Sequence, residues 1–257
     1  MRKPIILSWG VGLQSTCLLE MSLSGDFELP KLDYAIFSDT GFEHQHTHQI
    51  YDFYAPRALK SGIQVIKISG QDIFNDNFRH VTLPLFVMGT DRQIKRKCTR
   101  DYKIRPIHRR IRNLLGVNPR GRLHADLVDL WLGITTDEIE RATDSRVAYI
   151  THHFPLLDLR FTRKNCEEYL RTKGLPVPKK SSCRFCPYQQ GREWAEKNSL
   201  ELSLIVDLQD HINKNGLVKI GGQSKEMSFL PFHNILQADF SKQKIGLEEC
   251  EGGFCQC

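Results

Sequence analysis

The stretch IILSWGVGLQSTCLLEM, residues 5–21, decides the fold of this chain. It opens on a short apolar run, passes through a turn that contains Gly10 and Gly12, and continues into residues 14–21. There the apolar side chains recur at the spacing of a helix. A buried strand that leads through a glycine turn into a helix is the first half of a βαβ unit.

The same alternation continues along the chain. Residues 34–37 and 63–68 read as strands, and residues 44–59 between them read as a helix. Further elements are expected as a basic helix at 103–115, a strand at 126–132 and helices at 162–172 and 200–213. Short apolar strands alternating with helices predict an α/β fold, a doubly wound and mostly parallel sheet with helices on both faces.

Length and composition agree with this fold. The chain has 257 residues, of which 40% are hydrophobic and 26% charged, so it can bury a full core without disulfides. The helical pattern weakens after about residue 178. We therefore expect a nucleotide-binding α/β domain at residues 1–178 and a small helical, cysteine-bearing extension at residues 179–257.

The composition also excludes some classes of protein. No segment approaches the about 18 consecutive apolar residues of a membrane span, and the N-terminal apolar run is too short for a secretory signal. We therefore expect a cytoplasmic protein with no membrane partner, whose eight cysteines are reduced thiols. Cys17 and Cys166 lie among apolar neighbours and are expected to be buried structural thiols.

The loop after the first strand has the chemistry of a phosphate cradle. Glycines let the backbone amides approach an anion, and the N-terminus of the next helix adds N–H groups and partial positive charge. The residues expected to bind a nucleotide here are Ser8, Gly10, Gly12, Gln14, Ser15 and Thr16. An ordinary glycine-bearing turn would look the same, and the loop is neither a Walker A loop nor a dinucleotide fingerprint.

A second loop strengthens the prediction of a nucleotide site. Asp39, Thr40 and Gly41 follow the second strand, at the same carboxyl edge of the sheet, where open parallel sheets bind ligands. An acidic residue at this edge binds a ribose or Mg²⁺, or else it caps the next helix.

With both loops in view, the chain resembles the PP-loop nucleotide α-hydrolases, and more narrowly their phosphoadenosine phosphosulfate (PAPS) reductase-like branch, including phage-type members. The resemblance rests on the two loops and on three later segments, and it covers residues 5 to about 190. The later segments are Cys98 to Pro106, Gly133 to Arg141, and Phe154 to Pro176 with its Pro-Leu, helix and Gly-Leu-Pro parts.

The resemblance implies that ATP or PAPS binds on the loop, with Mg²⁺, and that the bond between the α and β phosphates is cleaved. It adds Gly133 to the nucleotide site and implies catalytic roles for Lys103, Arg105 and Asp137. One position departs from the family pattern, because Gln14 stands where an aspartate normally precedes the serine. A glutamine cannot serve as a charged ligand of magnesium.

The cysteines indicate a metal centre. Cys183 and Cys186 form a CxxC pair followed by a proline, and two thiolates at this spacing bind one metal centre. The resemblance to iron–sulfur adenylylsulfate reductases adds Cys98, although Lys97 stands where that family has a second cysteine. The fourth ligand is expected from the tail, with Cys250 as the candidate, unless one iron remains open. A 4Fe–4S cluster is preferred over structural zinc, and soft thiolates suit both metals.

Basic residues are dense between positions 92 and 112, with few acidic neighbours. Arg100, Arg109 and Arg110 are expected to contact phosphate groups of a nucleotide or a nucleic acid, unless this segment is an ordinary solvated helix. The formal net charge of +6 agrees with a nucleic-acid partner without requiring one.

Three functions follow as hypotheses. The first is an ATP-dependent enzyme with an iron–sulfur centre that adenylates and then thiolates a nucleic acid or nucleobase. Its sulfur is delivered through the cluster or a cysteine persulfide, with a donor protein as a candidate partner. The second is reduction of a sulfonucleotide, PAPS or adenylylsulfate. The third is a nucleotide-binding partner subunit without catalysis, which Gln14 favours.

Overall fold

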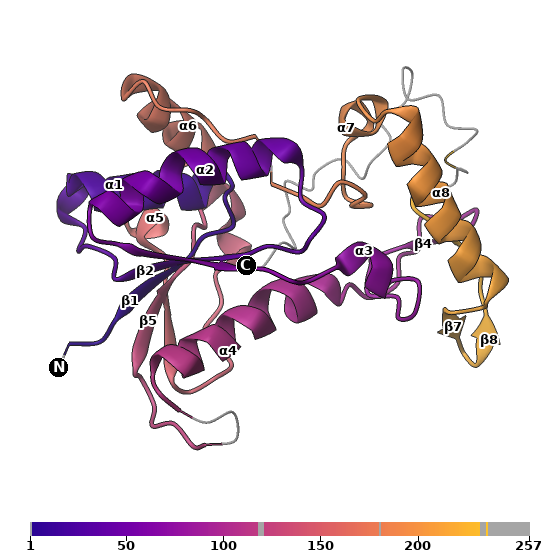
Figure 1. Ribbon diagram of the computed structural model, residues 1–257, viewed down its shortest axis with the longest axis horizontal. Helices are drawn as coiled ribbons and strands as arrows, with labels where there is room; N and C mark the ends of the chain where they lie inside the picture. The colour runs from indigo at the N-terminus through magenta and orange to yellow at the C-terminus, as the bar shows by residue number, and fades with distance from the viewer. Residues whose placement is uncertain (1, 118–120, 180, 232–234, 236–257) are drawn as a thin grey trace. The chain divides into compact units, whose positions relative to one another are not determined.

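A parallel five-stranded sheet is the centre of the fold. The computed structural model describes residues 2–117, 121–179, 181–231 and 235 (Figure 1). The strand order in the sheet is β3-β2-β1-β5-β6, and each strand is parallel to its neighbours. These strands are β1 (Ile5–Ser8), β2 (Tyr34–Ser38), β3 (Gln64–Ile68), β5 (Val128–Trp131) and β6 (Ile150–His153).

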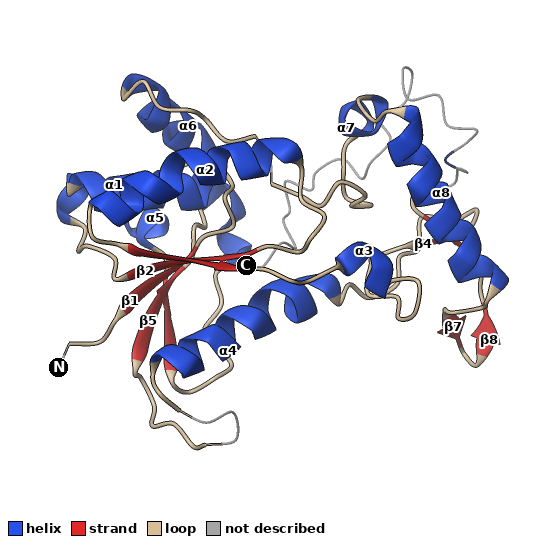
Figure 2. Ribbon diagram, in the orientation of Figure 1, coloured by secondary structure: helices blue, strands red, loops and turns tan. Residues whose placement is uncertain are grey.

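Helices cover both faces of this sheet, as Figure 2 shows. One face carries α1 (Leu13–Ser24), α2 (Gln45–Lys60) and α6 (Arg163–Thr172), and the other carries α4 (Arg105–Leu114). This confirms the doubly wound α/β fold expected from the alternation of strands and helices. The expected helix at 103–115 differs at its start, because residues Arg100–Ile104 form a π-helical turn, η2, before α4.

The strand order places a switch point at the centre of the sheet. From β1 the chain moves outward to β2 and β3, then crosses back to β5 and continues outward to β6 on the other side. The loops after β1 and β5 therefore diverge at the carboxyl edge, and the gap between diverging loops is where open α/β sheets bind ligands.

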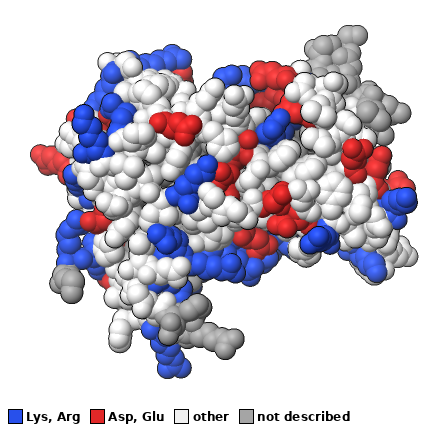
Figure 3. Space-filling model, viewed as in Figure 1, with Lys and Arg blue, Asp and Glu red and all other residues white. Residues whose placement is uncertain are grey.

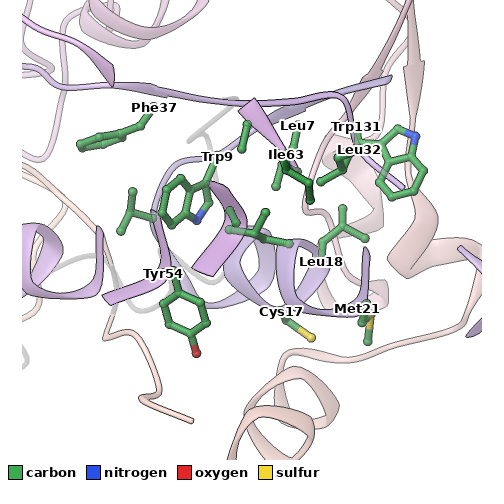
Figure 4. Packing of buried hydrophobic residues seen from close by; sticks show 14 of the residues in the cluster. Leu7, Trp9, Cys17, Leu18, Met21, Leu32, Phe37, Tyr54, Ile63 and Trp131 are labelled. Atoms are coloured by element: carbon green, nitrogen blue, oxygen red, sulfur yellow. The ribbon is translucent and has the colours of Figure 1, made fainter. Parts of the chain in front are cut away.

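Two clusters of buried side chains hold the layers together. The first joins α1, α2 and α6 to the sheet and includes Trp9, Leu18 and Tyr54, all at most 1% exposed (Figure 4). Cys17 and Cys166 are fully buried in it, which confirms their expected burial. The second cluster lies under α4 and includes Ile107 and Ile111. Burial of this kind is the main stabilising contribution to an α/β fold.

Local capping explains where the helices begin and end. Gly25, at φ +69°, ends α1, with its N–H bonded to the Met21 carbonyl. Thr162 and Asn165 form a capping box at the start of α6, which matches the helix expected at 162–172. The helix α8 (Ser199–Lys214) begins with a second capping box, Asn198 with Glu201, and matches the helix expected at 200–213.

Short elements complete the part of the chain that the structure describes. They are η1 (Asp26–Glu28), α3 (Ile73–Asp76), β4 (Phe86–Val87), η3 (Thr136–Arg141), α5 (Pro155–Asp158), α7 (Gly191–Ala195), β7 (Lys219–Ile220), β8 (Gln223–Ser224) and β9 (Met227–Ser228). The strand β4 pairs antiparallel with β9, and β7 with β8. Among the helices described, none is long and apolar enough to cross a membrane.

The chain divides into two compact units. Of the described residues, the first unit contains 2–71, 101–117, 121–179 and 181, and so holds the parallel sheet. The second unit contains residues 72–100, 182–231 and 235. Residues 72–100, although they lie between two segments of the first unit in the sequence, belong with the second unit.

Candidate nucleotide site and cysteine segment

The loop between β1 and α1 is held in a strained conformation. Trp9 N–H donates to the Ile36 carbonyl at 2.9 Å, and Thr16 N–H donates to the Gly12 carbonyl at 2.9 Å. Between these anchors Val11 has a φ of +56°, a conformation that β-branched residues rarely adopt. The Val11 side chain is 1% exposed, so its packing offsets part of the strain. Strain of this kind gathers at ligand-binding loops.

The hydroxyl groups of this loop differ in their surroundings. Ser8 is the last residue of β1, and its buried Oγ has no hydrogen-bond partner among the residues that the structure describes. Ser15 Oγ donates to the Gly12 carbonyl at 3.3 Å. Thr16 is fully buried, and its Oγ1 accepts from Trp9 Nε1 at 3.0 Å. Ser8 is therefore the hydroxyl with unused hydrogen-bonding capacity, whereas the Thr16 hydroxyl is occupied by its hydrogen bond to the Trp9 ring.

The second loop, Asp39 to Gly41, is also ordered by its own contacts. Asp39 Oδ1 accepts from Gly41 N–H at 2.9 Å, and Asp39 Oδ2 lies 3.0 Å from Lys67 Nζ. Gly41 has a φ of +82°, which explains the glycine at this position. The Asp39 carboxylate thus already has a cationic partner within the protein.

The loop after β5 touches the start of α1. A Cβ added to Gly133 would lie 2.7 Å from Ser15 N and 2.9 Å from Ser15 Cα, so this approach requires a glycine. Gln14 Nε2 donates to Glu138 Oε1 at 3.0 Å, and Arg141 donates to the other oxygen of the same carboxylate. Glu138 lies in the segment Gly133 to Arg141 that carries part of the family resemblance, and nothing in the sequence placed it beside Gln14. The structure shows that Glu138 supplies a carboxylate beside Gln14, where residue 14 itself has none.

A small pocket opens at the carboxyl edge of β1 and β2. It is lined by Ser8, Trp9, Gly10, Ser38, Lys103 and Ile107. The π-helical turn that precedes α4 presents Lys103 to this pocket. Ser38 Oγ donates to the Tyr102 carbonyl at 2.6 Å, and Gln71 Nε2 donates to the same carbonyl at 3.1 Å. These bonds fix the turn, and π-turns are frequent at functional sites.

The other two expected catalytic residues lie elsewhere. Arg105 is mostly exposed and pairs with Asp101 one turn earlier, at 2.8 Å. Asp137 accepts a hydrogen bond from the backbone N–H of Arg163, at the first turn of α6. Of the three expected catalytic residues, Lys103 is the one that lines the pocket.

The expected phosphate-contacting arginines are all exposed. Arg109 and Arg110 lie on α4, and Arg100 begins the π-helical turn. Figure 3 shows Lys and Arg side chains along the edge that α4 occupies in Figure 1. His108, on the same helix, has its pKa lowered to about 4 by burial and by the nearby His152, so it adds no charge near neutral pH.

The expected metal ligands Cys98, Cys183 and Cys186 all belong to the second unit and are each partly exposed. Cys186 N–H donates to the Cys183 carbonyl at 3.0 Å, which closes the CxxC turn. The Arg96 guanidinium lies 5.5 Å from the centre of the Tyr188 ring, so the segment before Cys98 contacts the segment after Cys186. Cys250 lies outside the described residues.

The fit of these cysteines to a metal centre is partial. Cysteine thiolates are the usual ligands of zinc and iron–sulfur centres. The buried ammonium of Lys197, near Cys186, would stabilise the negative charge of such a thiolate-bound centre. Lys197 Nζ has no hydrogen-bond partner in the described part of the chain, and its pKa is lowered to about 8 by burial, against the charges of Glu201, Glu193 and Cys186. Yet no three His, Cys, Asp or Glu side chains in that part form a group that could hold a metal ion. We therefore assign no reaction step to such a centre.

Comparisons with known proteins find similarity only among solved structures. No family model matches the chain, and no curated protein matches it. One similar structure is the PAPS reductase from Candida auris in its phosphate complex, with 14% identity and a TM-score of 0.37, over 68% of this chain and 74% of that one. Another is the U34-tRNA thiolase NcsA from Methanococcus maripaludis with its 4Fe–4S cluster, with 13% identity and a TM-score of 0.47, over 83% of this chain and 66% of that one.

The chain spans about two thirds of the length of the thiolase. At these identities and TM-scores, the similarity assigns no substrate and no activity to this chain.

Proposed function

We propose that this protein is an ATP-dependent enzyme that cleaves the bond between the α and β phosphates and adenylates a nucleic acid or nucleobase. The observation that carries the proposal is the loop after β1. Its strained Val11, the unpartnered Ser8 hydroxyl and the N-terminus of α1 meet at the switch point of a parallel sheet. Backbone amides at a helix N-terminus with unused donors nearby bind phosphate groups.

The residues of the loop and of the pocket have separate roles in this reaction. The amides at Gly10 and Gly12 and the Ser8 hydroxyl bind the phosphates, and Lys103 stabilises the charge that develops when a substrate oxygen attacks the α-phosphorus. Pyrophosphate leaves, and the substrate oxygen carries AMP. A sulfur nucleophile then attacks the adenylated carbon and AMP departs with the oxygen, which makes the overall change a thiolation. The nucleophile is the terminal sulfur of a persulfide, which a sulfur-donor protein loads onto Cys98, Cys183 or Cys186 or presents itself. A cysteine thiol then cleaves the disulfide formed between the substrate and the persulfide carrier, which leaves the thiolated substrate and a protein disulfide that an external thiol reduces.

The test is Gly12→Val. An added Cβ at Gly12 meets only the Ser181 side chain, with its Oγ at 2.8 Å, so the fold should accept the change once that hydroxyl rotates. The branched side chain nevertheless stands where a phosphate must approach the backbone. Calorimetric titration with ATP should show binding to the wild type and none to the variant, while both melt cooperatively. Equal ATP affinity in the two proteins would refute the assignment of the loop.

A further inference from the structure

Glu43 is a buried carboxylate at the edge of the sheet, and it is not among the residues proposed to bind the nucleotide. Its residue is 4% exposed and its side chain 1%, although it lies only two positions after the Asp39 to Gly41 loop. Removing a carboxylate from water is costly unless a cation or hydrogen-bond donors compensate it. The contacts of this side chain therefore indicate what it is for.

Both compensating groups lie at one oxygen of Glu43. Thr40 Oγ1 donates to Oε1 at 3.0 Å, and Lys103 Nζ lies 3.8 Å from the same atom. The second oxygen, Oε2, is buried and has no hydrogen-bond partner among the residues described. Glu43 thus faces the ammonium group that lines the pocket.

Lys103 is consequently held from two sides. Its backbone belongs to the π-helical turn that Ser38 and Gln71 fix through the Tyr102 carbonyl. Its ammonium lies beside the Glu43 carboxylate, and the Lys103 side chain is itself 18% exposed. A carboxylate in this position limits how far the ammonium extends and offsets part of its charge.

We propose that Glu43 is the positioning residue of Lys103: it holds the ammonium at the wall of the pocket and restrains it from binding the nucleotide phosphates too tightly before the reaction. This inference rests on the proposed function, because it assumes that the pocket receives ATP. It adds a residue that acts through Lys103 and does not itself touch the nucleotide.

The experiment is a calorimetric titration of ATP into Glu43→Gln. The amide keeps the size of the side chain and the acceptor for Thr40, but it removes the charge that faces Lys103. Lys103 then interacts more strongly with phosphate, so the Kd for ATP should fall by about three- to tenfold. A residue needed only for packing would leave ATP binding unchanged or weaken it.

Two controls separate this effect from general electrostatics. Glu20 is a matched carboxylate, with its side chain 4% exposed, Oε1 2.9 Å from Arg57 and Oε2 without a hydrogen-bond partner, and Glu20→Gln should not change the Kd. In a Lys103→Met background, Glu43→Gln should have no further effect on ATP binding, because the ammonium through which it acts is gone.

Thermal stability gives a second reading that does not require ATP. Lys103→Met leaves the Glu43 carboxylate without its nearby cation and should lower the Tm by several degrees. Adding Glu43→Gln to that variant should restore part of the loss. This comparison remains valid even if Glu43→Gln alone folds poorly.

The outcomes separate the two proposals. A wild-type protein that does not bind ATP refutes the proposed function. A wild type that binds ATP, with Glu43→Gln no tighter and no recovery of Tm in the double variant, overturns the role of Glu43 alone. Tighter binding in Glu43→Gln, abolished in the Lys103→Met background, supports it.

Discussion

At Gly133 two loops of the candidate nucleotide site come into backbone contact. The loop after β5 lies against Ser15, and the Gln14 amide reaches Glu138 on the segment that follows. At the residue scale, the site depends on such close approaches and on one strained residue, Val11. Each is a single position at which the choice of side chain decides whether the loops assemble.

Gly133→Ala should therefore destabilise the protein, by about 1–3 kcal/mol, because its Cβ would lie 2.7 Å from the Ser15 backbone nitrogen and the backbone cannot yield as a side chain does. Gly12→Ala is the matched control, since the nearest atom to its Cβ is the Ser181 hydroxyl at 2.8 Å, which can rotate away. Chemical denaturation measures both. A Gly133→Ala variant as stable as Gly12→Ala would contradict the close approach.

At the scale of elements, α4 and the π-helical turn η2 before it bring the candidate catalytic residue and two exposed arginines together. The π-helical turn η2 presents Lys103 to the pocket. On α4, Ile107 and Ile111 pack against the sheet, whereas Arg109 and Arg110 are exposed. One short helix thus connects the candidate catalytic residue to a basic surface. A phosphate-rich substrate is the partner that this arrangement favours.

Charge reversal of Arg109 and Arg110 to Glu should weaken binding of RNA or DNA and lower the slope of log Kd against log salt by about 1–2. The control is the same reversal at the exposed Lys31 and Lys60, which changes the net charge equally on other parts of the chain. Titrations at several salt concentrations give the slope. The same slope in both double variants would show that α4 is a solvated helix without a nucleic-acid role.

His108 on α4 should make the fold sensitive to acid. Its pKa is lowered to about 4 in the folded protein, by burial first and then by His152, whereas an unfolded histidine titrates near about 6.5. Between these values the unfolded chain binds the extra proton, so stability falls as the pH drops from about 6.5 toward about 4. His108→Asn should reduce that loss, as urea denaturation at a series of pH values would show. Identical pH profiles would contradict the assignment.

At the scale of the whole molecule, the chain leaves its first unit after residue 71 and returns at about residue 101. Residues 72–100 thus place Cys98 in the same unit as Cys183 and Cys186, which are distant in the sequence. Within that unit, the ring centres of Phe74 and Phe185 are 5.5 Å apart, so residues 72–100 pack against the CxxC segment. Membership of one unit is compatible with a shared ligand set, although the described side chains do not form one in this structure.

We propose that one metal centre uses all three of these cysteines, so that serine at any of them lowers the metal content by more than half, because a ligand set that loses one member holds its metal poorly. Elemental analysis and visible spectra of anaerobically purified protein give the metal content and separate iron–sulfur from zinc. Cys166→Ala, in the core of the first unit, is the control and should lower stability only. Unchanged metal content in Cys98→Ser would exclude a shared centre.

The sequence by itself determined the parallel α/β architecture and the position of the glycine-bearing loop between β1 and α1. Apolar spacing and glycine turns are local signals, and they were sufficient to predict β1, β2, β3, α1 and α2 within a few residues. The same local chemistry pointed to Ser8, Gly10 and Gly12. Weakly patterned elements such as β6 and α7 were not predicted, because four or five residues carry too little periodicity.

Only the tertiary structure decided which distant residues meet. The contact between Gln14 and Glu138 spans 124 positions, and the approach of Glu43 to Lys103 depends on a π-helical turn that leaves no periodic signal in the sequence. No local sequence pattern predicts the positive φ of Val11 or the membership of residues 72–100 in the second unit. Such features arise because packing of the whole chain fixes each backbone segment against others, and local preference yields to it.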